Sequence, residues 1–463
     1  MTLSPHIELS PQVASVAAAL AGAGHHAVLV GGAVRDALLG QSGPDLDLAT
    51  DATSAQLREV LRELPDIRGV YALGERFGTV GVALDDGTIL EISTLRAEQG
   101  PLAERFAADA ALRDFTVNAM GLDLASGELL DPLDGREDLT RCILRAPGDP
   151  ADRFAEDPIR VLRAARFVAQ LGFALDPVTA AAMPPLAARL ADVAVERVRE
   201  ELTKLLTAPH VADGLAALHA SGALAVVLPE VAALDGVTQP SFHDLDVLAH
   251  TVQSVSAAPP TRALRWAALL HDTGKAPTRT VDPDGRIRFL GHAPESARIA
   301  QKVCSRLRFS NIDRAAVVHL VAEHMRLGEL HADNPHAVDR AVRKLDLRLG
   351  PAADVPPLVS AEDALELTLA DFSATAHRGE AETVRAQLEQ VIAQSRARGT
   401  HAETRSPLSG TELMQALGLA EGPAVGIATN AIVAAIDDGT LAPDDRSGAL
   451  EIARGAISRF RRP

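Results

Sequence analysis

Hydrophobic and polar positions divide the chain into two parts with different periodicity. Over the first 145 residues, short apolar and β-branched runs alternate with turn signals, a pattern typical of strands and short helices. From Asp149 onward, apolar positions recur at helical spacing and rarely depart from it. The pattern therefore predicts an α+β protein in which a mixed head is followed by an all-helical neck and body.

The head pattern is specific enough to place individual elements. Residues 26–32 (HAVLVGG) predict a strand that ends in a glycine turn, and residues 33–40 predict a short helix closed by Gly40. Further strands are expected at 45–50, 77–84 and 88–94. The DDG tripeptide at 85–87 predicts a hairpin between the last two strands.

Helices are predicted for most of the remaining chain. Residues 157–173 and 192–206 have amphipathic spacing. Five more helices are expected at 211–236, 243–257, 261–271, 294–308 and 312–325, and breaks at 256–261, 276–286, 350–357 and 395–409. These patterns suggest four domains: a head (1–148), a neck (149–210), a body (211–400) and a C-terminal helical region (401–463).

Composition agrees with a globular, cytoplasmic protein. Hydrophobic residues make up 47% of the 463 positions and charged residues 23%, which excludes a disordered chain. Cys142 and Cys304 are too few for a disulfide framework and are expected to be reduced thiols. We expect no signal peptide, because the N-terminus lacks a basic region and an apolar core, and no membrane span, because no run of about 18 apolar residues occurs.

The formal net charge of −17 argues at first against a nucleic-acid partner. Net charge is nevertheless a weak criterion, because a protein can use acids to bind metal ions and needs only a local basic surface to contact nucleic acid. Basic residues cluster at 160–166, 340–348 and 459–462, although each cluster is also what a solvated helix face looks like.

Asp45 and Asp47 are the first candidate for chemistry. Two residues apart on a predicted strand, they face the same side, and Mg²⁺ is a natural partner for such a pair. Acidic pairs are also common on exposed strands without any metal. Just upstream, Gly31 and Gly32 permit close backbone approach to a triphosphate, and Arg35 adds a positive charge.

A second pattern of interest surrounds residue 160. Asp157, Arg160 and Arg163 are spaced three apart and are expected to share a helix face. A carboxylate accepts a hydrogen bond from the amino group of cytosine or adenine, and a guanidinium donates to ring acceptors, so the pair would reject guanine and uracil. An ordinary surface ion pair explains the same spacing.

In combination, these segments resemble the class II tRNA nucleotidyltransferases and bacterial poly(A) polymerases of the polymerase β superfamily. The resemblance begins with LVGGAVRDALLG and DLDLAT and continues over about 180 residues through LRDFTVNAM, DPLDGREDL, AEDPIRVLRAARF and ERVREELTKLL. It implies a polymerase β-like head and a nucleotide-selecting helix in the neck.

The resemblance also implies roles for individual residues. Asp45 and Asp47 would bind the catalytic Mg²⁺. Independently of the resemblance, Glu91 on the strand predicted at 88–94 is a candidate third carboxylate acting as a base, and a solvated strand residue is the alternative interpretation. The expected nucleotide contacts are Gly31, Gly32, Arg35, Arg113, Asp114, Asp157, Arg160, Arg163 and Arg166. The implied reaction is attack by the 3′-terminal ribose hydroxyl of tRNA on the α-phosphate of CTP or ATP, with release of pyrophosphate.

One segment departs from the family pattern. Many relatives have a longer stretch before Arg113, ending in two arginines, and it acts as a flexible lever in switching from C to A. Here the stretch is short and Leu112 replaces the first arginine. Enzymes that add only the two C residues resemble this form, so CC addition is an alternative to complete CCA addition.

A second candidate centre lies in the body. The order of its histidines and aspartates resembles the HD phosphohydrolase domain that accompanies some tRNA nucleotidyltransferases. The candidate metal ligands are His250, His271, Asp272, His292, His324 and Asp371. Mixed imidazole and carboxylate ligands suit a divalent transition metal or Mg²⁺, which would activate water to hydrolyse phosphate esters.

These observations favour an enzyme that adds CMP and AMP to the tRNA 3′ end and carries an accessory HD phosphohydrolase. Two other classes of function stay open from the sequence. One is an HD phosphohydrolase whose head only senses nucleotides, and the other is a non-catalytic RNA-binding protein that uses its helical body as a clamp.

Overall fold

The computed structural model describes most of the chain, and everything below concerns that part. The described ranges are 9–41, 46–62, 64–74, 78–96, 99–239, 245–330, 335–348, 356–376, 378–398, 406–420, 422–437, 440–442 and 444–460. The chain divides into two compact units, Met1–Pro229 and Glu230–Pro463, and each is described by itself. Within the described residues, no helix has the length and apolar character needed to cross a membrane.

A seven-stranded sheet organises the head, in the order β3-β4-β5-β2-β1-β6-β7. Its strands are β1 (Ala27–Val30), β2 (Asp47–Thr50), β3 (Ile67–Gly74), β4 (Thr79–Leu84), β5 (Ile89–Thr94), β6 (Gly121–Asp123) and β7 (Leu129–Leu130). Only the β2–β5 pair is parallel, and the other neighbours are antiparallel. The expected hairpin joins β4 to β5, with Gly87 at φ +89° in its turn.

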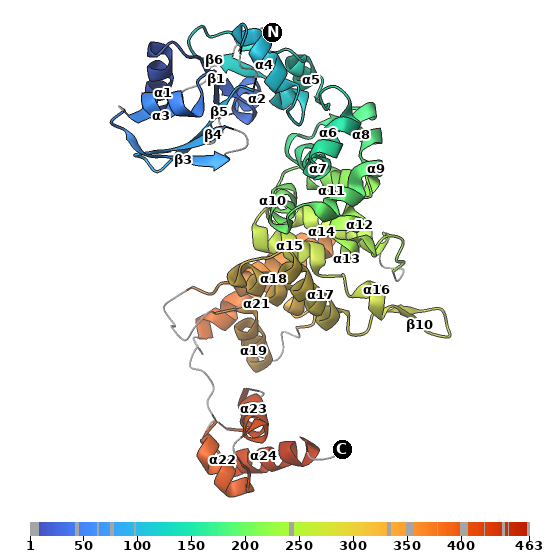
Figure 1. Ribbon diagram of the computed structural model, residues 1–463. Helices are drawn as coiled ribbons and strands as arrows, with labels where there is room; N and C mark the ends of the chain where they lie inside the picture. The colour runs from blue at the N-terminus through green and yellow to red at the C-terminus, as the bar shows by residue number, and fades with distance from the viewer. Residues whose placement is uncertain are drawn as a thin grey trace. The chain divides into compact units, whose positions relative to one another are not determined.

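Helices cover this sheet and bury its centre. They are α1 (Pro11–Gly22), α2 (Gly32–Leu38), α3 (Ser54–Arg62), α4 (Leu102–Ala110) and α5 (Gly135–Thr140), with a 3₁₀ turn η1 at Thr116–Asn118. Figure 1 shows them around the strands in the blue and cyan part of the chain. All of β1 is buried, and Phe106 and Ala110 of α4 share an apolar cluster with Val28 and Val30.

The helical part of the first unit follows. Its elements are α6 (Pro150–Glu156), α7 (Ile159–Leu171), α8 (Pro177–Ala182), α9 (Pro184–Ala187), the 3₁₀ turn η2 (Ala188–Asp192), α10 (Val195–Leu206), α11 (Val211–Ala220) and α12 (Ala223–Val227), with the short pair β8 (Ile143–Leu144) and β9 (Ala174–Leu175). Helix α7 is nearly all buried on one side and packs against α10 and α11.

For two of the expected helices, a single residue explains why the structure differs. The helix predicted at 157–173 begins at Ile159, because Pro158 keeps Asp157 in an extended conformation at φ −139°. The single helix predicted at 211–236 is three short helices, α11, α12 and α13 (Pro229–Ala232). Gly222 at φ +73° separates the first two, and Pro229 starts the third.

The second unit is almost entirely helical. Its elements are α14 (Val247–Ala257), α15 (Arg262–Leu270), α16 (Lys275–Thr278), α17 (His292–Arg306), α18 (Asn311–Glu323), α19 (Pro335–Leu345), α20 (Ala361–Ser373), the 3₁₀ turn η3 (Arg378–Glu380) and α21 (Ala381–Arg398). Trp266 on α15 is fully buried and meets Phe309 edge to face, with ring centroids 5.1 Å apart. The helix expected at 243–257 starts at Val247, where Asp246 caps it through the Ala249 N–H.

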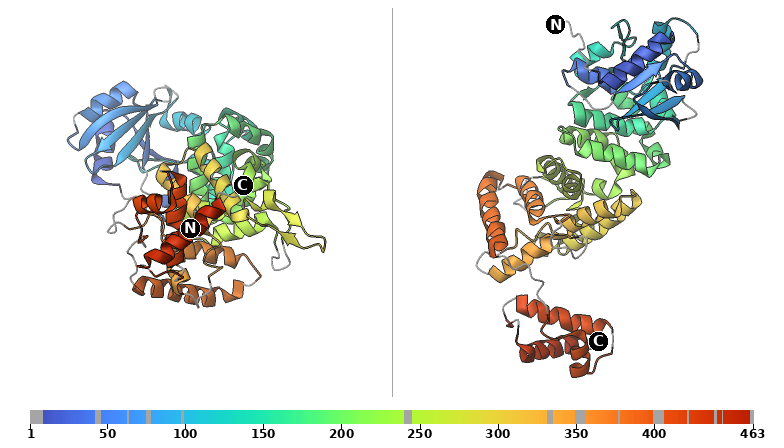
Figure 2. Two further views of the ribbon diagram at one scale, coloured as in Figure 1. Left: turned by 90° about the horizontal axis from the view of Figure 1, so that it is seen from below. Right: turned by 90° about the vertical axis from the view of Figure 1, so that its left-hand side faces the viewer.

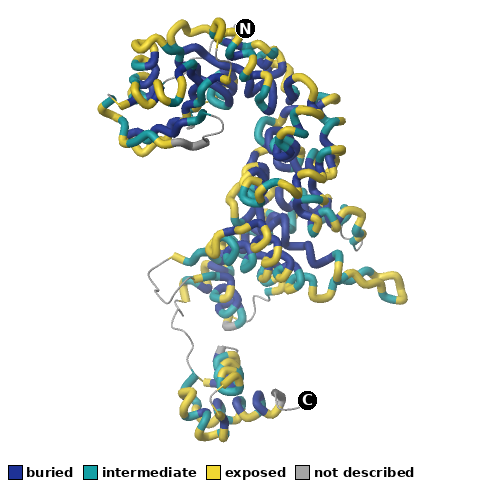
Figure 3. The backbone as a smooth tube through the Cα atoms, in the orientation of Figure 1, coloured by how far each residue is buried: buried dark blue, intermediate teal, exposed yellow. Residues whose placement is uncertain are grey.

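Two further parts of this unit stand out. The break predicted at 276–286 contains β10 (Thr280–Val281) and the turn of a β-hairpin whose second strand is β11 (Ile287–Arg288). This hairpin is exposed over most of its length (Figure 3). The last helices, α22 (Gly410–Leu417), α23 (Pro423–Asp437) and α24 (Arg446–Phe460), pack on one another around their own apolar cluster (red in Figure 2).

Candidate functional sites

The glycine turn after β1 has the geometry that the sequence suggested. Gly31 has φ +73° and ψ −133°, a conformation that side chains disfavour. A Cβ atom at Gly31 would lie 3.2 Å from Nη1 of Arg113, so the backbone passes close to that guanidinium. Glycine is therefore needed here both for conformation and for space.

Beside this turn lies a cavity of about 660 Å³ within the first unit. Every residue expected to contact the nucleotide lines it: Gly31, Gly32, Arg35, Arg113, Asp114, Asp157, Arg160, Arg163 and Arg166. Asp47 also lines the cavity, whereas Asp45 lies outside the described residues. The fold thus gathers residues from four sequence motifs into one space.

Asp47 and Glu91 supply carboxylates of the kind that bind a hard cation. Asp47 begins β2 and is exposed. Its register partner on the parallel strand β5 is Glu91, which is also exposed. Register partners on neighbouring strands face the same side of a sheet, so the two carboxylates can serve one divalent ion.

A series of hydrogen bonds links four of the residues that line the cavity. Arg35 donates to Oδ1 of Asn118 over 2.6 Å, and Nδ2 of Asn118 donates to Oδ1 of Asp114 over 3.0 Å. The other oxygen of Asp114 accepts from Nε of Arg163 over 2.8 Å. Burial alone would raise the pKa of Asp114, but the Arg163 charge and the Asn118 hydrogen bond outweigh it and lower that pKa. Asp114 is therefore held as an anion that fixes Arg163.

The two residues expected to read the base do not pair with each other. Asp157 forms an ion pair with Arg197 of α10, with Nη2 2.8 Å from Oδ2. Arg160 donates instead to two backbone carbonyls, that of Leu112 over 2.6 Å and that of Arg153 over 3.1 Å. The expectation that both share a helix face was wrong, because Asp157 precedes α7 and is extended.

Several lining residues were not singled out from the sequence, notably Asn118, Phe167, Arg197 and Lys204. The Arg166 guanidinium lies over the ring of Phe167, 3.7 Å from its centroid. Arg197 and Lys204 lie in the segment ERVREELTKLL, where their position in a recognised motif was the available signal. Seven cationic side chains and four carboxylates line the cavity, so the site is locally basic in an acidic chain.

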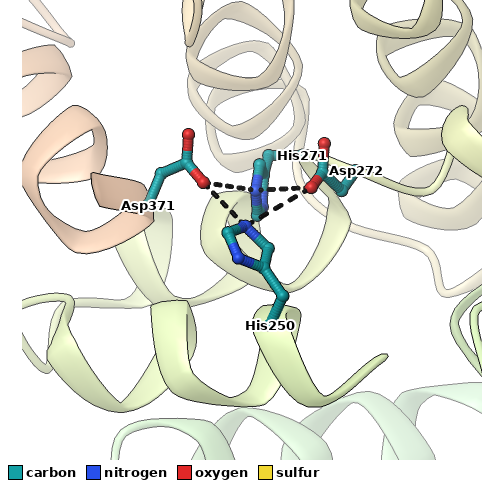
Figure 4. A group of neighbouring side chains, drawn as sticks. All are labelled: His250, His271, Asp272 and Asp371. Atoms are coloured by element: carbon teal, nitrogen blue, oxygen red, sulfur yellow. Dashed lines mark hydrogen bonds and ion pairs between the residues drawn. The ribbon is translucent and has the colours of Figure 1, made fainter. Parts of the chain in front are cut away.

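A second cluster forms within the second unit from widely separated segments. His250 lies on α14, while His271 and Asp272 follow the end of α15. Asp371 lies near the end of α20 and meets the others at one point (Figure 4). Nε2 of His250 is 2.7 Å from Oδ1 of Asp371, and Nε2 of His271 is 3.2 Å from Oδ2 of Asp272.

The remaining two candidate ligands approach the same aspartate from its other side. His292 is the first residue of α17, and its Nε2 lies 3.7 Å from Oδ1 of Asp272. His324 follows α18, and its ring centroid lies 5.4 Å from that of His292. Asp272, His292 and His324 thus form a second group with metal-ligand spacing, joined to the first through Asp272.

Backbone carbonyls orient all four imidazoles in the same way. Nδ1 of His250 faces the Ala374 carbonyl at 3.2 Å, and Nδ1 of His271 faces that of Ala268 at 2.8 Å. Nδ1 of His292 and of His324 lie 3.0 Å and 2.8 Å from the carbonyls of Phe289 and Val321. Since a carbonyl only accepts, each Nδ1 carries a proton, so that each imidazole in its neutral form turns the lone pair of Nε2 toward the cluster.

The cluster fits a divalent metal ion. The Nε2 atoms of His292 and His324 are buried and have no hydrogen-bond partner among the described residues. Burial lowers the pKa of His271, but the neighbouring Asp272 and Asp371 outweigh burial and raise it to about 10, which measures how strongly the site attracts a positive charge. Ligand atoms without partners in a buried, negative site are what a bound cation would satisfy.

Family models match three stretches of the chain. Residues 27–145 match the model described as "Poly A polymerase head domain", and residues 172–234 match "Probable RNA and SrmB- binding site of polymerase A". Residues 252–351 match the model described as "HD domain".

Individual relatives extend the similarity over almost the whole chain. An A-adding tRNA nucleotidyltransferase from Deinococcus radiodurans is 36% identical over 88% of this chain and 91% of its own. A CC-adding tRNA nucleotidyltransferase from Thermus thermophilus is 36% identical over 93% of each. The crystal structure of the Bacillus stearothermophilus CCA-adding enzyme in complex with CTP has the same fold, with a TM-score of 0.64 at 24% identity over 98% of this chain and 100% of that one. The chain therefore belongs to the tRNA nucleotidyltransferases, and it carries an HD domain.

Proposed function

We propose that this protein adds CMP and AMP from CTP and ATP to the 3′ end of tRNA without a nucleic-acid template. The observation that supports it best is the single cavity lined by the glycine turn, Asp47, Asp157 and seven cationic side chains, one of which is Arg160. Because the proposed substrate is tRNA, we also propose a cytoplasmic location.

At phosphorus the reaction forms one P–O bond and breaks one. The 3′-terminal ribose oxygen of tRNA bonds to the α-phosphorus, the proton of that hydroxyl passes to Glu91 as the candidate base, the bond from the phosphorus to the bridging oxygen of the β-phosphate breaks, and pyrophosphate leaves. We assign Asp47, with Asp45 and Glu91, to holding Mg²⁺, which when bound would neutralise charge on the phosphates. Arg35, Arg113 and Arg163 would orient the triphosphate, and the network through Asp114 keeps Arg163 in place.

Base selection would draw on Asp157 and Arg160. The carboxylate of Asp157 can accept from the amino group of cytosine or adenine, which guanine and uracil lack at that position. In the structure Arg197 donates to both oxygens of Asp157 and fixes the orientation of the carboxylate, and each oxygen keeps a further lone pair for an incoming base. Arg160 would exchange the Leu112 carbonyl for a base acceptor.

CC addition alone is a second candidate, and helix α4 favours it. The segment that acts as a lever in longer relatives is here largely this helix, whose Phe106 is fully buried against the sheet. A helix anchored in the core is poorly suited to swing between two nucleotide-binding states.

Extension of defined tRNAs separates these alternatives. Transcripts ending before the CCA sequence and transcripts ending in CC are incubated with CTP, ATP or both, and the products are sized. When CTP and ATP are both present, we expect three added nucleotides on the transcript that ends before CCA and one on the transcript that ends in CC. Arrest after two cytidines with ATP present would establish the CC-adding form, and no incorporation into either would refute the proposal. Asp47→Ala should abolish every product.

For the HD domain we propose metal-dependent hydrolysis of phosphate esters. Its support is the cluster of His250, His271, Asp272 and Asp371, with His292 and His324 as further ligands. Release of phosphate from simple esters, with Mg²⁺, Mn²⁺, Ni²⁺ or Zn²⁺ supplied in turn, tests it. Activity that survives Asp272→Ala would contradict it.

A further inference from the structure

The HD cluster opens onto a cavity of about 950 Å³ that is also lined by part of the β10–β11 hairpin. Asp272, His292 and Asp371 of the cluster line it. The consecutive residues Gly285 to Leu290, which include all of β11, line it as well. A cavity of this size is large enough for a substrate that extends well beyond the phosphate to be cleaved.

The wall carries apolar groups that have no packing role in the protein core. Leu290 is 75% exposed, and Met325, which lines the same cavity, is 38% exposed. Phe289 lies between them in the lining and is only half-buried. Clustered exposed apolar side chains around a polar centre are typical of ligand sites.

Cations complete the lining. Arg286 is exposed at the turn end of β11, and Lys275 lies at the cluster end with Nζ 2.6 Å from Oδ2 of Asp272. Nζ of Lys275 also lies 5.6 Å from the centroid of the Phe289 ring. The cavity therefore combines positive charge for a phosphate with a flat apolar surface, which is the complement of a nucleotide.

The hairpin is held in a fixed place relative to the cluster. The carbonyl of Phe289 accepts the Nδ1–H of His292 over 3.0 Å. A turn that closes with Gly285 at φ +83° and an ion pair from Arg288 to Asp282 give the hairpin its shape. Phe289 therefore orients the candidate metal ligand His292 through its backbone carbonyl and also lines the cavity.

We propose that the β10–β11 hairpin is the specificity element of the HD site and that Phe289 and Leu290 on it recognise the nucleobase of a nucleotide substrate. Phe289 and Leu290 pack on the base, and Arg286 pairs with phosphate. This proposal rests on the proposed hydrolytic function of the same cluster. The base-bearing phosphate is either a free nucleotide or the terminal nucleotide of an RNA.

Kinetics of the full-length, metal-loaded protein test the selection. Adenosine 2′-, 3′- and 5′-monophosphates are compared with glycerol 2-phosphate, which has no base, and with a short RNA ending in a phosphate. Stacking predicts that Phe289→Ala lowers kcat/KM about tenfold for the adenosine substrates, mostly through KM, and leaves that for glycerol 2-phosphate nearly unchanged. Phe289→Trp should restore the preference, and Arg286→Ala should raise KM for all substrates. Greater activity on the RNA than on the mononucleotides would identify the terminal nucleotide as the source.

Controls separate this proposal from the hydrolytic function itself. Ile312→Ser changes an exposed apolar residue on α18 that is not among the cavity lining, and it should match the wild type, whereas Leu290→Ser should resemble Phe289→Ala. If Phe289→Ala lowered kcat/KM equally for esters with and without a base, the proposed role of the hairpin would be refuted, while the proposed hydrolytic function would stand.

A binding measurement covers the case in which hydrolysis is absent. Calorimetric titration of adenosine 5′-monophosphate is performed in an Arg163→Ala background, which weakens nucleotide binding by the head cavity. A Kd that Phe289→Ala raises about tenfold supports the hairpin even if no ester is cleaved. A Kd that does not change refutes it.

Discussion

Arg197 was not singled out by sequence reasoning, yet its ion pair with Asp157 controls a carboxylate to which we assign base selection. The two side chains are 53% and 35% exposed, so the pair contributes no more than about 1 kcal/mol to stability. We predict that Arg197→Ala leaves the melting temperature nearly unchanged but lowers kcat/KM for CMP incorporation about tenfold, because Asp157 loses its orientation. Steady-state incorporation into tRNA measures this.

Arg141→Ala provides the matched control for that variant. Arg141 is a similarly exposed arginine of the same unit, paired with Glu137 across one helical turn. It should affect neither stability nor incorporation. Equal losses in both variants would show that Arg197 acts only through the general charge of the surface.

Asp114 predicts a pH dependence of stability. Its side chain is 9% exposed and bonded to Arg163, so Asp114→Asn should cost about 2 kcal/mol near pH 7. The folded-state pKa of Asp114 lies below its ordinary value. Its contribution is therefore complete above the unfolded-state pKa, near 4, and is lost as the pH falls through the folded-state value.

Calorimetric melting of both proteins between pH 7 and pH 3 checks this sign. The difference in melting temperature should stay constant from pH 7 to about pH 5 and shrink only below about pH 4. A difference that grows on acidification would contradict the assignment.

At the scale of elements, the sequence predicted strands β1, β2, β4 and β5 and helices such as α2, α7, α10 and α15, because their periodicity is local, whereas β3 and the helices after α18 were not placed individually. The β4–β5 hairpin and the strand at β1 followed from β-branched runs and turn residues. Boundaries were less predictable where one residue overrode the pattern, as Pro158 does for Asp157 and Gly222 does between α11 and α12. The β10–β11 hairpin was read as a break because its strands have only two residues each.

Pairing between distant residues was the part that sequence could not supply. The partner of Asp157 lies 40 residues away on α10, and the partner of Asp114 lies 49 residues away on α7. Spacing within a helix suggested Arg160 as the partner of Asp157, whereas packing of α10 against α7 brings Arg197 to it. The recognised motifs predicted which residues belong to each site. Which of these residues bond to one another became clear only from the folded structure.

Gly274 offers a test of how α17 is positioned. A Cβ atom at Gly274 would lie 2.3 Å from the carbonyl oxygen of His292 and 2.7 Å from the amide nitrogen of Ser296. Both are backbone atoms of α17, so Gly274→Ala must displace the helix that begins with His292. We predict a loss of about 1–3 kcal/mol in stability and reduced metal content, measured by melting and by elemental analysis.

Gly328→Ala is the control for this substitution. A Cβ atom at Gly328 would meet only the Met325 carbonyl, at an ordinary 3.6 Å. Stability and metal content should stay close to wild type. Metal content that is unchanged in Gly274→Ala would show that α17 can move without disturbing the cluster.

At the scale of the whole molecule, the two proposed metal centres differ in their exposure. Asp47 and Glu91 are exposed, while His250, His271 and Asp272 are almost completely buried. An ion at the head should therefore exchange readily, and an ion in the cluster should be retained. We predict that metal remains bound after gel filtration without added metal, in the wild type and in Asp47→Ala but not in Asp272→Ala.

Elemental analysis of the three filtered proteins shows which of them retains metal. Equal metal in all three would place the retained ion outside the cluster. Loss from Asp47→Ala alone would reverse the proposed order of affinity.

The position of Asp272 between two groups of histidines has a thermodynamic consequence. Its Oδ2 faces His250 and His271, and its Oδ1 faces His292. If the Asp272 carboxylate changes its charge or orientation on binding an ion beside His250 and His271, the electrostatic field beside His292 changes as well. Occupancy of the two positions is therefore linked, and by reciprocity each ion must change the affinity for the other by the same factor. A titration with metal should then deviate from the curve of two independent sites.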